Sequence, residues 1–264
     1  MDQRFSSVTL LAIDAALLAG EILRRGFGSH FSIECKKEGL QNLVTEYDRL
    51  SEKTVIEYIL HHHPSSHFLA EESGNSGKDS SETLWVIDPL DGTVNFAHGI
   101  PFFSVSIAAA QKKQVVSGVI YNPITRELFV SERGKGSFCN GKKIGVSKVS
   151  KLQDSYLASG FPYHVNKNPQ QCIERTAEVL RIGCPIRLLG SAALDLAYTA
   201  SGRFDGFFEV SLAPWDVAAG LLILEEAGGR VTHWDRKPFD LFANGNFLAT
   251  NGLIHDSLSK ILCS

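Results

Sequence analysis

The chain has little of several features that mark particular classes of protein. Its five cysteines are odd in number, lie far apart and form no Cys-x-x-Cys pair, which argues against a disulfide framework or a zinc knuckle and for a reducing compartment. No uninterrupted apolar run approaches bilayer length, so we expect a cytoplasmic protein without a membrane partner. The formal net charge of -3 lacks the basic excess of nucleic-acid binders, so no nucleic-acid partner is expected.

The composition is that of a globular protein with a large core. The chain has 264 residues, of which 44% are hydrophobic and 21% are charged. This length is near the upper limit for one hydrophobic core and allows one large domain or two fused halves. The sequence has no repeat and no low-complexity linker. We therefore expect residues 1–264 to form a single domain whose halves, about 1–150 and 151–264, share one core.

Hydrophobic periodicity and turn residues predict both helices and strands. Helices are expected at 7–25 and 46–61, and the second starts with a capping box at Thr45 to Asp48 and stops at Pro64. The first half should also contain a polar loop at 73–81, a buried strand at 84–87 broken by Asp88-Pro89, and an antiparallel meander over 102–137. The second half should contain a helix at 191–200, a strand at 204–210 and a helix at 214–227. This succession predicts a mixed α/β (α+β) fold of helices layered on sheets.

Acidic residues stand at the ends of several of these expected elements. They are Glu71 and Glu72 before a loop, Asp88 and Asp91 after a strand, Asp216 at a helix start, and Asp48 near the start of the second helix. Each has an ordinary structural interpretation by itself. Asp-Pro-x-Asp-Gly is often a solvated turn, Asp48 suits a helix cap, and Asp216 suits the positive end of a helix dipole.

The segment Asp88-Pro89-Leu90-Asp91-Gly92-Thr93 carries the most chemical information. A buried strand delivers two carboxylates three residues apart, and Mg²⁺ in proteins is usually held by one or two carboxylates together with substrate phosphate. Two carboxylates on one turn can hold neighbouring metal ions about 4 Å apart, the spacing that clamps the attacking and leaving oxygens of a phosphate. The Gly-Thr that follows offers backbone N–H groups and a hydroxyl to phosphate oxygens. The segment therefore indicates a metal-assisted phosphate site.

Three motifs resemble those of one known family. They are Phe68-Leu69-Ala70-Glu71-Glu72-Ser73, the long segment from Trp85 through Asp88-Pro89-Leu90-Asp91-Gly92-Thr93 to Phe96, and Trp215-Asp216-Val217-Ala218-Ala219-Gly220 followed by Glu226-Ala227-Gly228-Gly229. With Leu43-Val44-Thr45 and Asp48, they resemble the inositol monophosphatases over nearly the whole chain. The resemblance implies a layered αβαβα sandwich of the inositol monophosphatase and fructose-1,6-bisphosphatase type. It also implies two or three Mg²⁺ ions, inhibition by lithium and a homodimer.

The resemblance also implies roles for individual residues. Glu71, Asp88 and Asp91 would be carboxylate metal ligands, the Leu90 carbonyl would add an oxygen, and Asp216 would reach a second metal. Glu71 would help to position a metal-bound water, and Thr93 with Asp48 would help to deprotonate it. Residues implied to bind the substrate are Glu71, Leu90, Asp91, Gly92, Thr93, Gly190, Ser191, Ala192, Glu209 and Asp216. Lys37 falls where the family places a basic residue near a third metal, although Lys36 is its neighbour.

The expected activity is Mg²⁺-dependent hydrolysis of inositol 1-phosphate by a metal-activated water. Relatives also act on fructose 1,6-bisphosphate, histidinol phosphate or adenosine 3′,5′-bisphosphate, and fold and metal chemistry do not choose among these esters. Members acting on the nucleotide tend to continue the second motif with Lys-Glu-Phe, whereas this chain has Val94-Asn95-Phe96, which favours a small polyol phosphate. The segment from Phe161 to His164 is expected to border the leaving-group pocket.

Four other interpretations compete with this one. An aspartyl-phosphate phosphatase needs its second aspartate two residues after the first, and Asp91 follows Asp88 by three. An EF-hand loop starting at Asp88 needs a glutamate at its twelfth position, where Gly99 stands. Consecutive histidines at 61–63 point in different directions on a helix and cannot form one compact zinc site. A non-catalytic regulatory protein on this fold stays open as an alternative.

Overall fold

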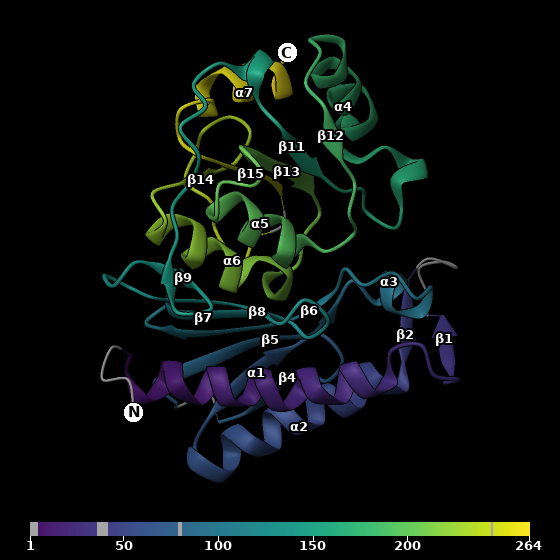
Figure 1. The fold of residues 1–264 in the computed structure, drawn as a ribbon, viewed down its shortest axis with the longest axis vertical. Helices are drawn as coiled ribbons and strands as arrows, with labels where there is room; N and C mark the ends of the chain where they lie inside the picture. Colours follow the sequence, from purple (N-terminus) through teal and green to yellow (C-terminus); the bar gives the residue numbers. More distant parts are fainter. Residues whose placement is uncertain (1–4, 36–41, 79–80, 244) are drawn as a thin grey trace.

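The computed structural model describes residues 5–35, 42–78, 81–243 and 245–264, and its elements form five alternating layers. In Figure 1, α1 (Ser7–Gly26) and α2 (Glu46–His62) cover the outer face of a large sheet, and α5 (Ala192–Ala200) and α6 (Pro214–Glu226) lie between this sheet and a smaller one. The helices α4 (Cys172–Arg181) and α7 (His255–Leu262) lie on the far side of the smaller sheet. The predicted αβαβα order is confirmed.

The large sheet has eight strands in the order β10-β9-β8-β7-β6-β5-β3-β4. Only β3 and β5 are parallel neighbours, and the other pairs are antiparallel. The strands are β3 (His67–Ala70), β4 (Gly74–Gly77), β5 (Thr83–Asp91), β6 (Ser104–Gln111), β7 (Gln114–Asn122), β8 (Glu127–Glu132), β9 (Ser137–Cys139) and β10 (Lys142–Lys143). The meander predicted over 102–137 is thus β6, β7, β8 and the start of β9.

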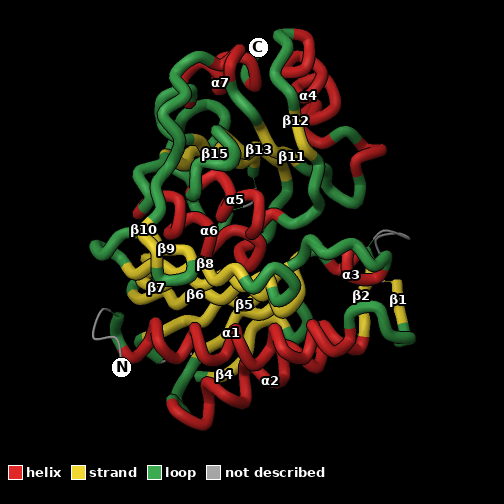
Figure 2. Tube along the Cα trace, in the orientation of Figure 1, coloured by secondary structure: helices red, strands yellow, loops and turns green. Residues whose placement is uncertain are grey.

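The smaller sheet has five strands in the order β12-β11-β13-β15-β14. Figure 2 shows β12, β11, β13 and β15 of this sheet above α5 and α6. They are β11 (Leu157–Ser159), β12 (Ile186–Arg187), β13 (Gly206–Val210), β14 (Arg230–Thr232) and β15 (Asn246–Thr250). A two-stranded ribbon, β1 (Ile33–Cys35) with β2 (Leu43–Thr45), and the short helix α3 (Thr93–Ala97) complete the first half. Three 3-10 turns lie at Leu152–Asp154, Val165–Lys167 and Pro169–Gln171.

The outer helix α1 packs closely on the sheet because its inner face is small. Ser6 accepts a hydrogen bond from the backbone N–H of Thr9 and starts the helix, as an N-cap serine does. The alanines at 12, 15, 16 and 19 are completely buried. A Cβ atom on Gly20 would lie 2.5 Å from the ring of Tyr121. Small side chains at helical spacing therefore set how near the helix comes to β7.

The central core lies between the two sheets and is built around α6. Residues 217–220 and 222–224 of this helix are buried, as expected for a helix that is apolar on all sides. The same core cluster contains Val86 and Ala108 from the first half with Leu196 and Phe207 from the second. Buried residues from both halves of the chain therefore pack into one cluster.

Two sequence predictions were wrong in detail. The strand predicted at 84–87 does not break at Asp88-Pro89: β5 continues to Asp91, with an irregular register against β6 between Asp88 and Asp91. Proline is tolerated at such a bulge because no ladder N–H is needed there. The polar loop predicted at 73–81 contains β4, an edge strand paired with β3. Its Gly, Ser and Asn residues show no alternation of apolar and polar positions that would reveal a strand.

The other predicted elements are confirmed to within about two residues at each end. His61 and His62 lie exposed in the last turn of α2. Lys36 and Lys37 lie outside the described residues. Across the described ranges, no helix is both long and apolar enough to cross a membrane.

Candidate active site

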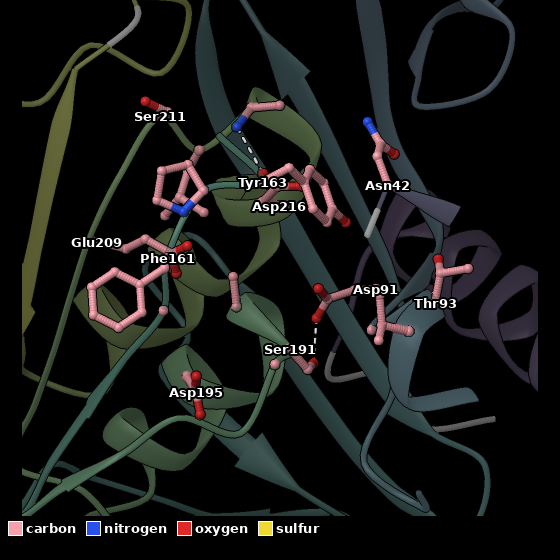
Figure 3. A pocket seen from close by; sticks show the side chains of 18 of the residues that line it. Asn42, Asp91, Thr93, Phe161, Tyr163, Ser191, Asp195, Glu209, Ser211 and Asp216 are labelled. Carbon is pink, nitrogen blue, oxygen red and sulfur yellow. Dashed lines mark hydrogen bonds between the residues drawn. The ribbon is translucent and has the colours of Figure 1, made fainter. Parts of the chain in front are cut away.

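A cavity of about 720 Å³ opens where the first and second halves of the chain meet (Figure 3). Its walls come from the turn after β5, the start of α5, the end of β13 and the start of α6. The predicted site residues on these walls are Glu71, Asp91, Gly92, Thr93, Gly190, Ser191, Ala192, Glu209 and Asp216. Phe161, Pro162, Tyr163 and His164 also line it, as expected for the segment that borders the leaving group. Asp48, Asp88 and Leu90 are buried and absent from its lining.

The turn after β5 depends on glycine at position 92. Gly92 has a φ of 94° and stands immediately before α3, a backbone conformation that glycine adopts without steric cost. A Cβ atom there would lie 3.0 Å from the carbonyl oxygen of Phe102 and 3.1 Å from that of Gly190. The turn therefore passes closely between two other backbone segments, one of which belongs to the second half.

The Asp91 carboxylate joins this turn to α5. Its Oδ2 accepts a hydrogen bond from the Ser191 hydroxyl (Figure 3). It also accepts one, at 3.0 Å, from the backbone N–H of Ala193. A carboxylate at a helix N-terminus is also stabilised by the helix dipole. Burial raises the pKa of Asp91 to about 6, although these hydrogen bonds act in the opposite direction.

Asp88 lies deeper and is 2% exposed. Its Oδ1 accepts a hydrogen bond of 3.1 Å from the backbone N–H of Leu90. Burial raises the pKa of Asp88 well above its ordinary value, and the charges of Glu71, Asp91 and Asp216 raise it further. Mutual repulsion of this kind favours proton uptake or the binding of a cation.

Glu71 and Asp216 approach the cavity from opposite halves of the chain. Glu71 directly follows β3, and its backbone N–H donates to the carbonyl oxygen of Ile87 at 3.1 Å, which holds it beside β5. Asp216 lies in the first turn of α6, and its Oδ2 accepts the N–H of Ala213 at 2.7 Å. The helix-end interpretation of Asp216 and its place on the cavity wall are thus compatible.

Thr93 and Asp48 form a buried polar pair. The Thr93 hydroxyl lies 2.8 Å from Asp48 Oδ1 and 2.9 Å from the Leu90 carbonyl oxygen. Asp48 Oδ2 accepts the N–H and the hydroxyl of Thr45 at 2.7 and 2.6 Å, which confirms the capping box. Burial raises the pKa of Asp48 to about 6, against the effect of its hydrogen bonds. Because Asp48 is completely buried, its path to the cavity runs through the Thr93 hydroxyl.

The donor set of this site suits a hard divalent cation. The described residues that line the cavity include no lysine or arginine but five carboxyl groups, those of Glu71, Asp91, Asp195, Glu209 and Asp216. Oxygen donors of this type are those that Mg²⁺ prefers. Among the described residues, no three His, Cys, Asp or Glu side chains already converge on one point.

Two residues at the site were not assigned a role from the sequence. Asn95 Nδ2 donates to the carbonyl oxygens of Phe102 and Leu189, both at 2.7 Å, and so ties α3 to the loop before α5. Asp195 lines the cavity one helical turn after Ser191. The signal for Asp195 is a single acidic residue in the otherwise apolar run Ala-Ala-Leu-Asp-Leu-Ala.

Comparison with known proteins gives matches over almost the whole chain. A family model described as the inositol monophosphatase family matches residues 5–264. An inositol-1-monophosphatase of Mesorhizobium japonicum is 40% identical, over 97% of this chain and 96% of its own length. A Haemophilus influenzae protein named Nus factor SuhB is 40% identical, over 95% of this chain and 94% of its own.

Solved structures agree with this relationship. The inositol monophosphatase of Anabaena superposes with a TM-score of 0.85 at 41% identity, over 97% of this chain and 95% of that one. An IMPase/NADP phosphatase complexed with Mg²⁺ and phosphate has a TM-score of 0.81 at 25% identity, over 96% and 95% of the two chains. The match with metal-dependent phosphatases accords with a cavity that is rich in carboxylates. The chain is a phosphatase and belongs to the inositol monophosphatase family.

Proposed function

We propose that the protein is a Mg²⁺-dependent phosphomonoesterase that hydrolyses inositol 1-phosphate to inositol and phosphate. The observation that carries this proposal is the cavity itself, whose described lining includes the carboxylates of Glu71, Asp91 and Asp216 and contains no lysine or arginine. Relatives at about 40% identity are named for this substrate. The Asn95 of the second motif also favours a polyol phosphate over a nucleotide.

Glu71, Asp88, Asp91, the Leu90 carbonyl and Asp216 would hold two or three Mg²⁺ ions. When bound, Mg²⁺ supplies charge that neutralises the phosphate and lowers the pKa of a water molecule. The backbone from Asp91 to Thr93 lies on the cavity wall and would bind the phosphate oxygens.

Proton transfer is assigned to Thr93 and Asp48. The Thr93 hydroxyl accepts the proton of the attacking water as it passes its own proton to Asp48 Oδ1, 2.8 Å away. General base catalysis of this kind works best when the pKa of the base is close to the working pH. A pKa of about 6 for Asp48 meets this condition.

The alcohol part of the substrate is assigned to Gly190, Ser191, Ala192 and Glu209. These residues line the same cavity from the second half of the chain. We also propose that the protein is a cytoplasmic homodimer, that lithium inhibits it, and that it has no nucleic-acid partner. Sedimentation analysis would test the dimer directly.

The test is phosphate release from inositol 1-phosphate, fructose 1,6-bisphosphate, histidinol phosphate and adenosine 3′,5′-bisphosphate. Each ester is assayed with Mg²⁺, with a chelator, and with Mg²⁺ plus Li⁺. Magnesium-dependent turnover that is fastest for inositol 1-phosphate is the expected result. Faster turnover of another ester would keep the mechanism and refute the substrate. No turnover of any ester would favour a non-catalytic regulatory protein.

A further inference from the structure

Asp195 is a buried carboxyl group on the wall of the active-site cavity. It lies in α5, four residues after Ser191, which places it about 6 Å further along the helix. Its side chain is 1% exposed, and it is one of the residues that line the cavity (Figure 3). Its backbone groups form hydrogen bonds within the helix. The N–H donates to the Ser191 carbonyl oxygen, and the carbonyl oxygen accepts a hydrogen bond of 2.7 Å from the Thr199 hydroxyl.

The side chain is not satisfied in the same way. Oδ1 of Asp195 is completely buried and has no hydrogen-bond partner among the described residues. A buried polar atom without a partner destabilises a protein, and a buried charged one does so strongly. Buried polar atoms of this kind are commonly satisfied by a ligand, an ion or a water molecule.

The surroundings of Asp195 indicate what kind of ligand could satisfy it. Its electrostatic neighbours are the carboxyl groups of Glu209 and Asp91. Burial raises the pKa of Asp195 well above its ordinary value, and the pKa of Glu209 is raised in the same way. A phosphate would be repelled from these groups, whereas an alcohol can donate to a carboxylate or accept from a carboxylic acid.

The Glu209 carboxyl group packs against Gly160, which has no side chain. A Cβ atom on Gly160 would overlap the Glu209 carboxyl group. The glycine therefore allows Glu209 to lie in this position. Glu209 from β13 and Asp195 from α5 thus present two carboxyl groups to the same cavity from separate elements.

We propose that Asp195 is a specificity-determining residue whose carboxyl group hydrogen-bonds a second hydroxyl of the leaving alcohol, beside the one bound by Glu209. The substrate class is then phosphate esters of polyols that carry at least two free hydroxyl groups. This inference rests on the proposed phosphatase function.

The test compares Asp195→Leu and Asp195→Asn with the wild-type protein on two esters, inositol 1-phosphate and p-nitrophenyl phosphate, which has no alcohol hydroxyl. The ratio of kcat/KM for the first ester to that for the second should fall about 10- to 100-fold in Asp195→Leu, the effect of losing one hydrogen bond to a charged group. Asp195→Asn should recover part of this ratio, since its amide still forms hydrogen bonds. An unchanged ratio in Asp195→Leu overturns the proposal.

Thermal unfolding without ligand distinguishes this role from a structural one. Asp195→Leu should melt at the wild-type temperature or above it, because it removes an unpartnered buried carboxyl. The matched control is Asp205→Asn, since Asp205 is also buried but accepts hydrogen bonds from the Ser147 hydroxyl and from the Tyr156 N–H. This control should melt at a lower temperature. A comparable loss in Asp195→Leu would refute the assignment.

Failure of the proposed function would be visible separately. If the wild-type protein hydrolyses neither ester, the phosphatase proposal fails, and calorimetry of inositol 1-phosphate and inorganic phosphate binding decides the inference. Weaker binding of inositol 1-phosphate by Asp195→Leu, with phosphate binding unchanged, supports the role of Asp195. Equal affinity of wild type and variant for both ligands overturns it.

Discussion

Replacing Gly92 by alanine should both destabilise the protein and reduce its activity. The φ of Gly92 is 94°, and a left-handed conformation costs an alanine roughly 1–2 kcal/mol. The added Cβ atom would also lie 3.0 Å from the Phe102 carbonyl oxygen and 3.1 Å from that of Gly190. Both contacts are with backbone, so relieving them requires segments to shift, which costs roughly another 1–3 kcal/mol. The expected loss of unfolding free energy is about 2–5 kcal/mol.

Gly99 provides a matched control for the backbone effect. It also has a positive φ, of 72°, but a Cβ atom there would have nothing within 4 Å. Gly99→Ala should therefore lose only the roughly 1–2 kcal/mol of the left-handed conformation. Urea unfolding of both variants, compared with wild type, separates the close approach from the conformation.

Activity should distinguish the two glycines even more clearly. Gly92 stands between Asp91 and Thr93, so a shift of this turn moves a candidate metal ligand and the candidate proton-transfer group together. Displacements approaching 1 Å can reduce a rate about 100-fold. Phosphate release should fall by this order in Gly92→Ala and stay near wild type in Gly99→Ala. Equal stability and equal activity of the two variants would refute the reasoning about the turn.

Three further predictions concern charge at the site and in the core. Asp91→Asn should keep the fold, because its side-chain oxygen can still accept hydrogen bonds from Ser191 and Ala193. It should lose nearly all turnover, at least about 100-fold. Circular dichroism and phosphate release test these two outcomes, and an active variant contradicts the mechanism. Asp48→Asn should lower kcat about 100-fold because it removes the proton acceptor, while the Mg²⁺ affinity measured by calorimetry stays close to that of wild type. An unchanged kcat would exclude Asp48 from proton transfer. Burial lowers the pKa of His255 from 6.5 to about 4, so the unfolded chain binds a proton at this residue before the folded one does. Protonation of His255 therefore lowers the free energy of unfolding by up to about 3 kcal/mol as pH falls from about 6.5 to 4. In His255→Gln, the unfolding free energy measured with urea should decline less steeply over this pH range, and an equally steep decline would show that His255 is not responsible.

Predictions that depend on neighbouring residues in the chain succeeded. The capping box at Thr45 and Asp48 lies within four consecutive residues, and both of its hydrogen bonds are present. The ends of α1 and α6 follow from local periodicity, capping and glycine, so short-range physics is enough to locate them. The positions of Asp88, Asp91 and Asp216 also depend on local sequence, since each lies in or beside a predicted element, whereas their role as metal ligands stays a prediction.

The sequence predicted strands and their pairing less well than it predicted helices. Nothing in the Gly-Asn-Ser-Gly of β4 favours a strand, and this segment is extended because it pairs with β3. Pro89 predicted a break, but β6 supplies hydrogen bonds on either side of an irregular register and β5 continues. Register against another strand is a long-range property that no local window contains.

The sequence by itself determined the family, because the motifs that carry it are local. Through the resemblance to that family it also predicted the order of the layers and the types of residue at the site. Only the tertiary structure decided which of these groups meet. The Ser191 hydroxyl donates to a carboxylate that lies 100 residues earlier in the chain, and Asp195 shares a cavity with Glu209 through the packing of α5 against the smaller sheet. Burial and mutual charge then set the protonation of these carboxyl groups, and both depend on distances in space that the order of residues does not encode.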